Sequence, residues 1–188
     1  MKLIKTEFDG LVIIEPNIYY DDRGYYFESY NYNKYGYIGN INFIQDSESY
    51  SKYGVIRGLH YQKPPYTQAK LVRVIKGRVL DVVVDIRTDS PTFGKHYSII
   101  LSDENKRQLF VPRGFAHGFI TLSEDAIFNY KVDNIYNPKS ESGIMYNDNN
   151  LNIDWLIKDH VIINDKDNNL LNFQYNIYYK NDEYLKNG

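Results

Sequence analysis

The chain has 188 residues, which is enough for one sizeable domain that buries its own core. Hydrophobic residues make up 43% and aromatic residues 16%, a globular composition with an unusual number of tyrosines, 20 in all. The net charge of −2 argues against a general binder of nucleic acids or anionic membranes, and the absence of cysteine excludes disulfides and thiolate metal sites.

The N-terminal segment is interrupted by Lys5, Glu7 and Asp9 before a long apolar run can form. We therefore expect neither a signal peptide nor a membrane span, and predict a cytoplasmic protein. One strand is predicted at 11–15, and a turn at Asp22, Arg23 and Gly24 precedes an aromatic run whose side chains alternate between two faces. Residues 31–42 predict an irregular loop or a single helical turn, and 43–51 a second strand.

The strongest pattern lies between residues 54 and 87. After Gly58, the side chains of His60 and Gln62 project to one face of a predicted strand. Residues 71–75 and 78–86 alternate around a predicted hairpin turn at Lys76 and Gly77. The second of these strands has one apolar face and carries two carboxylates, Asp81 and Asp85, on the other.

Further strands are predicted at 97–101, 108–112, 115–122 and 126–132. Short strands at this close, turn-punctuated spacing indicate an antiparallel sandwich or barrel, and the lack of long amphipathic helices argues against a doubly wound fold. From Asn134 onward the sequence is a polar connection up to Trp155 and then a low-complexity tail. We predict one domain over 1–188, with 168–188 as a peripheral or flexible tail formed by a short surface helix or a frayed end.

Residues 54–87 and 112–122 look like the two sequence blocks of a cupin-type barrel. Metal-binding cupins supply two histidines at i and i+2, a nearby glutamate and a third histidine. Here Gln62 stands at the second histidine position, no glutamate follows within 63–70, and Lys70 is the charged residue there. One histidine with His117 is too small a ligand set for a transition metal, so we predict no metal.

The barrel mouth instead offers five side chains for acid–base chemistry. His60 and His117 are candidate bases because imidazole titrates near neutral pH. Lys70 and Arg57 are candidates to hold an anion or a developing oxyanion, and Tyr130 to donate a proton. In a regular strand Arg57 and His60 lie on opposite faces, so they converge only if Gly58 marks a bulge.

The chain resembles the dTDP-4-dehydrorhamnose 3,5-epimerase family from about Leu11 to Asp167. The resemblance rests on the segments DDRGYYFESY, RGLHYQ, KLVRVIKG, DIRTDSPTFG, VPRGFAHGF, YNPKSESGI and DKD in this order. It implies an antiparallel jelly-roll (cupin-type) barrel with a few short peripheral helices. It also implies a metal-free, cofactor-independent, cytoplasmic homodimer that acts on a dTDP-linked 4-keto-6-deoxyhexose.

The resemblance further implies roles for individual residues. His60 would remove a proton from the sugar, Asp167 would orient His60, Tyr130 would be the acid on the opposite face, and Lys70 would stabilise the enolate oxygen. The residues implied to contact the nucleotide or the substrate are Arg23, Glu28, Gln45, Ser47, Arg57, His117, Glu141 and Lys166. Part of this nucleotide site would be completed across the dimer through exchanged N-terminal strands.

Four positions depart from the family pattern. Ser47 stands at a usual Asn, Tyr146 at a usual Trp, Leu156 at a usual Pro and Asn164 at a usual Ser. These departures leave the nucleotide preference open. The alternatives are a 3- or 5-monoepimerase, a ketoisomerase, a non-catalytic carbohydrate-binding jelly roll or, least favoured, a metal-dependent cupin.

Overall fold

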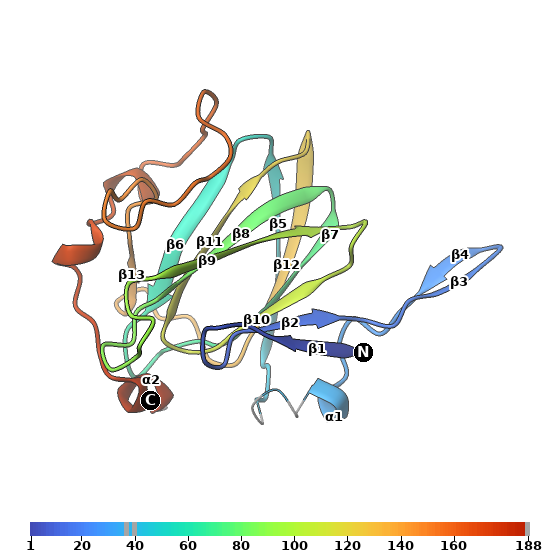
Figure 1. The fold of residues 1–188 in the computed structure, drawn as a ribbon, viewed down its shortest axis with the longest axis horizontal. Helices are drawn as coiled ribbons and strands as arrows, with labels where there is room; N and C mark the ends of the chain where they lie inside the picture. The colour runs from blue at the N-terminus through green and yellow to red at the C-terminus, as the bar shows by residue number, and fades with distance from the viewer. Residues whose placement is uncertain (36–37, 39–40, 187–188) are drawn as a thin grey trace.

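Antiparallel strands form two facing sheets in the computed structural model, which describes residues 1–35, 38 and 41–186 (Figure 1). The larger sheet contains, in spatial order, β1 (Lys2–Lys5), β2 (Val12–Glu15), β10 (Gln108–Val111), β7 (Lys70–Lys76), β12 (Asp125–Val132) and β5 (Gln45–Lys52). The second sheet contains β13 (Glu141–Gly143), β6 (Ile56–Gln62), β11 (Phe115–Thr121), β8 (Arg78–Asp85) and β9 (His96–Ser102). This is the predicted antiparallel jelly roll.

The core lies between the two sheets and follows from the period of two along each strand. Val72 and Val74 of β7 face Val79 and Val83 of β8, and the rings of β11 and β12 fill the remaining space. The opposite face of β8 is also apolar and packs under the C-terminal segment through Leu80, Val82 and Val84. Strand β8 is therefore buried on both faces, which explains its nearly continuous run of valines.

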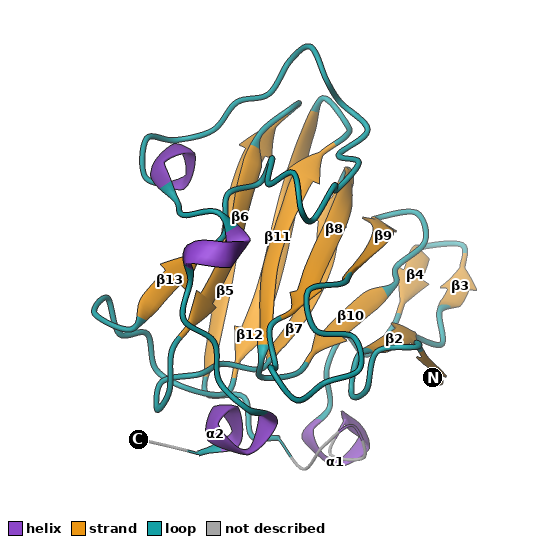
Figure 2. Ribbon diagram, turned by 60° about the vertical axis from the view of Figure 1, so that its left-hand side comes forward, coloured by secondary structure: helices purple, strands orange, loops and turns teal. Residues whose placement is uncertain are grey.

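Two irregular segments cover the outer faces of the sheets. Apolar residues between Tyr30 and Phe43 pack on the larger sheet, and residues of the C-terminal segment pack on the second one. The short helices lie in these coverings (Figure 2): α1 (Tyr32–Tyr35), the 3₁₀ helices η2 (Asp167–Asn169) and η3 (Phe173–Tyr175), and α2 (Asn181–Leu185). Helix α1 is the single helical turn expected in 31–42, although 36–37 and 39–40 lie outside the described residues.

Strands with their own alternating pattern begin and end within two residues of their predicted bounds. The strand expected at 11–15 is present as β2, but it is not the only strand of the first twenty residues, because β1 precedes it and β3 (Tyr19–Asp21) begins there as well. The aromatic run also leaves the strand conformation earlier than predicted, since β4 (Gly24–Tyr26) ends at Tyr26. Strand β13 lies in what the sequence predicts as a loop, because its backbone completes the edge of β6. No helix among the described residues has the length and apolarity needed to cross a bilayer.

Strands β3 and β4 form a hairpin that projects from the body of the protein (Figure 1). Its tyrosines, Tyr19, Tyr20, Tyr25 and Tyr26, are exposed. Arg23 lies at the tip, where it pairs with Asp21. Such an arm has no core of its own, so it buries little apolar surface within this chain.

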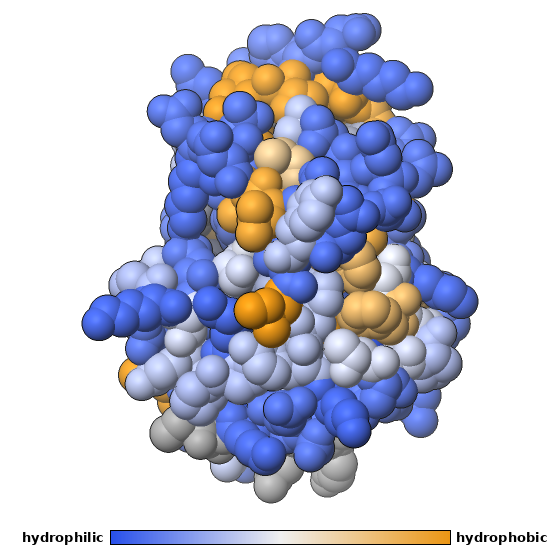
Figure 3. Space-filling view, turned by 90° about the vertical axis from the view of Figure 1, so that its left-hand side faces the viewer, coloured by the Kyte–Doolittle hydropathy of each residue, from blue (hydrophilic) through white to orange (hydrophobic). Residues whose placement is uncertain are grey.

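The C-terminal tail is anchored more firmly than a frayed end. Tyr184 of α2 is fully buried, its hydroxyl donates to the Ile86 carbonyl, and Thr67 donates to the Tyr184 carbonyl. On the side where this segment lies, hydrophobic patches are interspersed with hydrophilic residues (Figure 3). Residues 187–188 of the predicted tail lie outside the described residues.

Candidate active site

A cavity of about 330 Å³ opens between the two sheets. Strands β6, β7, β11 and β12 supply most of its walls, and β13 and the segment before η2 close one side. Eight residues predicted for the site line it: Arg57, His60, Lys70, His117, Tyr130, Glu141, Lys166 and Asp167. The barrel thus brings together residues that are up to 110 positions apart in the sequence.

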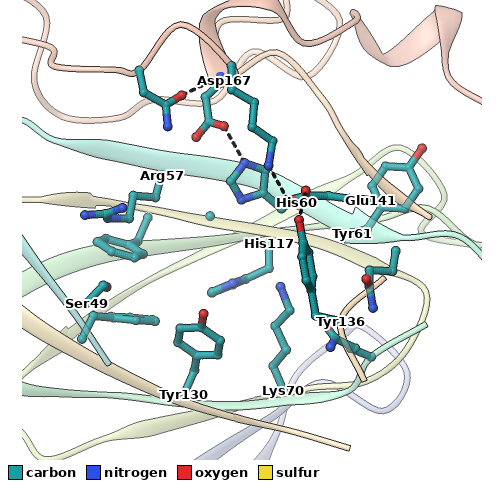
Figure 4. A pocket seen from close by; sticks show the side chains of 17 residues that line it. Ser49, Arg57, His60, Tyr61, Lys70, His117, Tyr130, Tyr136, Glu141 and Asp167 are labelled. Atoms are coloured by element: carbon teal, nitrogen blue, oxygen red, sulfur yellow. Dashed lines mark hydrogen bonds and ion pairs between the residues drawn. The ribbon is translucent and has the colours of Figure 1, made fainter. Parts of the chain in front are cut away.

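His60 and Asp167 form a hydrogen-bonded pair on one wall of the cavity (Figure 4). His60 Nε2 lies 2.7 Å from Asp167 Oδ1, and the Gly58 N–H donates to the other carboxylate oxygen over 3.1 Å. An ionised carboxylate only accepts hydrogen bonds, so His60 Nε2 carries the proton and Nδ1 keeps its lone pair. His60 Nδ1 makes no hydrogen bond to a described residue and remains available as a base.

Asp167 is buried, and burial alone would raise the pKa of its carboxyl. The hydrogen bond from His60, the Gly58 N–H and the charge of Lys166 act against burial, and the pKa of the carboxyl is lowered. Asn164 Oδ1 accepts the Asp167 N–H over 2.7 Å and fixes the start of η2. Asp167 is therefore held as an anion in a defined orientation behind His60.

A bulge at Gly58 brings Arg57 and His60 into the same cavity. His117 of β11 is paired with His60 and Phe119 with Arg57, so β6 has one extra residue between the two pairs. Gly58 has a φ of +124°, and a Cβ there would lie 2.5 Å from Gly118 Cα. The expected bulge is present, and glycine is required at it by both conformation and space.

Tyr130 and Lys70 lie across the cavity from His60 (Figure 4). They come from the larger sheet, on β12 and β7, where Val72 and Tyr130 are register partners. Neither the Tyr130 hydroxyl nor the Lys70 ammonium group makes a hydrogen bond to a described residue. Burial lowers the pKa of Lys70 to about 8, although Asp81 and Glu141 act in the opposite direction.

Lys166, Glu141 and Tyr136 form a charged network at the rim. Glu141 accepts hydrogen bonds from Lys166 and from the Tyr136 hydroxyl, both over 2.6 Å. Burial opposes the ionisation of Glu141, but these two partners lower the pKa of its carboxyl and keep it charged. The same hydrogen bond raises the pKa of Tyr136. The polar side chains of the rim therefore hold one another in place, which suits recognition of a polar ligand.

Four predicted ligand-binding residues lie outside this cavity. Arg23 is on the projecting hairpin, and Glu28 is paired with Lys34. Gln45 donates to the Ser47 hydroxyl over 3.0 Å at the start of β5, and Gln45 lines a second, smaller cavity. None of these four residues lines the larger cavity of its own chain, although Ser47 is the register partner of Tyr130 on the neighbouring strand.

Sequence reasoning missed several lining residues. Gln68 lies two residues before Lys70, so strand alternation could have found it. Ser49 lies two residues beyond Ser47 on β5, so the alternation along this strand could have indicated it as well. The Ser49 hydroxyl is buried without a partner among the described residues. Tyr136 gave no signal, because one tyrosine among 20 in a loop has no distinguishing pattern.

No group of three or more His, Asp or Glu side chains suited to a metal occurs in the described part of the chain. The Nε2 atoms of His60 and His117 are each bonded to a carboxylate, of Asp167 and Asp81 respectively. The arrangement can remove a proton on one side of a bound molecule, return one from the other side and stabilise an oxyanion between them.

Comparisons with known proteins agree with this geometry. Residues 5–175 match the family described as dTDP-4-dehydrorhamnose 3,5-epimerase. The enzyme of that name from Shigella flexneri is 48% identical over 171 residues, which cover 90% of this chain and 94% of the relative.

Two solved structures have the same fold. The dTDP-4-dehydrorhamnose 3,5-epimerase of Elizabethkingia anophelis is 51% identical with a TM-score of 0.90, covering 95% of this chain and 99% of that one. A dTDP-6-deoxy-D-glucose-3,5-epimerase from Legionella pneumophila, solved with dTDP-4-keto-L-rhamnose, is 46% identical with a TM-score of 0.92, covering 95% and 97%. The chain belongs to the dTDP-4-dehydrorhamnose 3,5-epimerase family.

Proposed function

We propose that the protein inverts C3 and C5 of dTDP-4-dehydro-6-deoxy-D-glucose to give dTDP-4-dehydro-L-rhamnose, in dTDP-L-rhamnose biosynthesis. The observation that carries the proposal is the His60–Asp167 pair facing Tyr130 and Lys70 across one cavity. Membership of a family of 3,5-epimerases supports the same reaction.

The chemistry of the substrate fits this set of groups. C3 and C5 both flank the C4 ketone, so one carbonyl acidifies the protons on both carbons. His60 Nδ1 takes a proton from one face, and the electron pair of the C–H bond moves into the enolate. Tyr130 then returns a proton to the same carbon from the other face, which inverts the centre. A positioned acid or base contributes about 10²–10⁴-fold to such a step.

Lys70 is the group that stabilises the enolate. An ammonium ion in a largely buried site interacts strongly with negative charge that develops on O4. Loss of one such oxyanion donor costs about 3–4 kcal/mol of transition-state stabilisation. Proton removal, enolate stabilisation and proton return all use groups of the chain, so the proposed mechanism requires no cofactor.

The remaining residues bind the nucleotide sugar. Arg57, on the same wall as His60, has Nη1 free of the hydrogen bonds that hold its other nitrogens to Ser51 and the Tyr50 carbonyl. It is suited to a diphosphate oxygen. We assign His117, Glu141 and Lys166 to the sugar and diphosphate, and Gln45 and Ser47 to the nucleotide.

We infer that the protein is a homodimer in which the partner's hairpin completes the nucleotide site. The exposed tyrosines and the position of Arg23, remote from the cavity of its own chain, support this arrangement. Glu28 belongs to the same exchanged segment. The cytoplasmic location expected from the sequence stays a prediction.

A product assay tests the proposed function. Purified protein is incubated with dTDP-4-dehydro-6-deoxy-D-glucose, and the sugar product is identified by proton NMR. We expect the L-lyxo 4-ketosugar, with coupling constants that report inversion at C3 and C5. Inversion at one carbon would make the protein a monoepimerase, a 3-ketosugar would make it a ketoisomerase, and unchanged substrate would reject the proposal.

A further inference from the structure

Asp81 is a buried carboxylate for which the mechanism above has no use. It lies on the interior face of β8 between Val79 and Val83, and it is fully inaccessible to solvent. Asp81 Oδ2 accepts a hydrogen bond from His117 Nε2 over 2.9 Å, whereas Oδ1 makes no hydrogen bond to a described residue. A buried carboxylate with an unbonded oxygen is costly, so compensating positive charge is expected nearby.

Lys70 is the cation with which Asp81 interacts electrostatically. Lys70 lines the same cavity as His117, to which Asp81 is hydrogen-bonded. The other titratable groups of that cavity on the barrel strands include His60 on β6, Tyr130 on β12 and Glu141 on β13. Asp81 gives the largest electrostatic effect that favours the charged form of Lys70, ahead of Glu141. Glu141 also forms an ion pair with Lys166 and accepts a hydrogen bond from Tyr136, so its negative charge is already partly compensated.

The His117–Asp81 pair resembles the His60–Asp167 pair but lies deeper. His60 and His117 are register partners on adjacent strands. The His60 side chain is 29% exposed and the His117 side chain 7%. Both histidines line the cavity, and the His117–Asp81 pair is the more deeply buried of the two pairs.

We propose that Asp81 is a positioning residue for this reaction, which holds His117 through Nε2 and keeps the Lys70 side chain protonated in the working pH range. The proposal rests on the proposed function for its catalytic meaning. The electrostatic interaction between Asp81 and Lys70 can be measured in the protein without any substrate.

The coupling is measured directly by labelling. Only the neutral amine of a lysine reacts with acetic anhydride, so the acetylation of Lys70, followed by peptide mass spectrometry across pH 6–11, reports its titration. Removal of the Asp81 charge removes an effect that raises the pKa of Lys70. We expect Asp81→Asn to move the Lys70 labelling curve to lower pH by about one unit. A curve that superimposes on the wild type would overturn the proposal.

The pH dependence of turnover gives a second readout. Protonated Lys70 is present below its pKa of about 8 and is lost as the pH rises through that value. The wild-type kcat/KM should therefore fall above pH about 8, as Lys70 loses its proton. The kcat/KM of Asp81→Asn should begin to fall at a lower pH. Lys70→Arg, whose guanidinium stays charged, should not show this fall, and Asp81→Asn should cause no shift in that background.

Three further variants distinguish loss of the Asp81–Lys70 interaction from a general loss of stability. Asp85→Asn removes a buried carboxylate on the same strand that is bonded to Arg87, so it should destabilise the protein without moving the Lys70 curve. Asp81→Glu keeps the charge and should retain a curve close to the wild type. If Asp81→Asn does not fold, Asp81→Ser removes the same charge with a smaller side chain, and the same shift is expected.

The two proposals fail separately. A shifted labelling curve in a protein without epimerase activity would support the Asp81–Lys70 coupling and reject the proposed function. Normal epimerisation together with an unshifted Lys70 labelling curve would support the proposed function and reject the Asp81–Lys70 coupling.

Discussion

At the scale of single residues, the His60–Asp167 pair carries the first proton transfer that we propose. His60→Ala removes the base but not a core side chain, since the His60 side chain is partly exposed. We expect turnover to fall by about 10²–10⁴-fold or more, with an unchanged circular dichroism spectrum. Asp167→Asn keeps the shape but not the charge and should give a smaller loss. Near-normal rates in His60→Ala would show that the base is another residue.

Tyr130 is the proposed acid, and its hydroxyl is the only group of the side chain that can donate a proton. Tyr130→Phe keeps the ring against Phe128 and removes the proton donor. We expect deuterium from solvent to enter one carbon of the sugar while inversion is blocked, because His60 can still remove and return a proton on its own face. The measurement is NMR of substrate recovered from D₂O. Full epimerisation by this variant would remove Tyr130 from the mechanism.

How far the sequence predicts the site depends on the residue. His60, Lys70 and Tyr130 lie in strands with clear alternation, so their faces could be inferred from the pattern. Asp167 is 107 positions from His60 in a 3₁₀ turn, and no periodicity links the two. Only the family resemblance pointed to Asp167, and the buried Asp81–His117 contact was found only in the three-dimensional arrangement.

At the scale of elements, the Gly58 bulge aligns two functional side chains on one strand. A methyl group at Gly58 would meet Gly118 Cα at 2.5 Å and force a φ of +124° on alanine. We expect Gly58→Ala to lower the free energy of unfolding by about 1–3 kcal/mol from backbone strain alone, and more from the clash. Activity should fall further than stability accounts for, because the register of Arg57 against His60 changes.

Chemical denaturation and kcat/KM, measured side by side, check this prediction. Gly24→Ala is a matched control for the backbone conformation, since its φ is +127° but no atom lies within 4 Å of the added carbon. If Gly58→Ala loses no more stability than Gly24→Ala and keeps full activity, the bulge does not set the geometry of the site.

Elements with their own hydrophobic pattern could be predicted from sequence, and those that depend on a neighbour could not. Strands β7, β8 and β11 bury side chains on defined faces, and their alternation is visible in the chain. Strands β1 and β13 are short edge strands whose conformation comes from pairing with β2 and β6. Their own residues give little signal, because pairing and not burial specifies them.

The tail provides a prediction at the same scale. Tyr184 is fully buried under the barrel, and its hydroxyl also accepts the Tyr179 N–H. We expect Tyr184→Ala to lower the free energy of unfolding by about 3–5 kcal/mol, the cost of deleting a buried aromatic side chain. Tyr175→Ala is the control, since Tyr175 is exposed in the same segment. Equal unfolding midpoints in urea for the two variants would mean that the tail does not stabilise the barrel.

At the scale of the whole molecule, Arg23 and His60 of one chain are expected to serve different active sites. Arg23→Ala should weaken substrate binding, and His60→Ala should abolish turnover. When the two variants are co-expressed with different tags, each mixed dimer contains one site with both residues intact. We expect the purified mixed dimer to recover about half of the wild-type kcat/KM, because its one intact site also binds the substrate normally.

The control for this experiment is a mixed dimer of His60→Ala with Asp167→Asn. Both residues belong to one site on one chain, so mixing cannot restore an intact site. Failure of the first pair to exceed this control would place Arg23 in the site of its own chain. A monomer in light scattering would reject the dimer outright.

The central claim is proton exchange at both carbons beside the ketone, and deuterium incorporation tests it most directly. The protein is incubated with dTDP-4-dehydro-6-deoxy-D-glucose in D₂O, and the label is located by proton NMR and mass spectrometry, with His60→Ala as the control. We predict deuterium at C3 and at C5 with the wild-type protein and at neither carbon with the variant. A wild-type protein that binds the nucleotide sugar but introduces no deuterium would contradict the account.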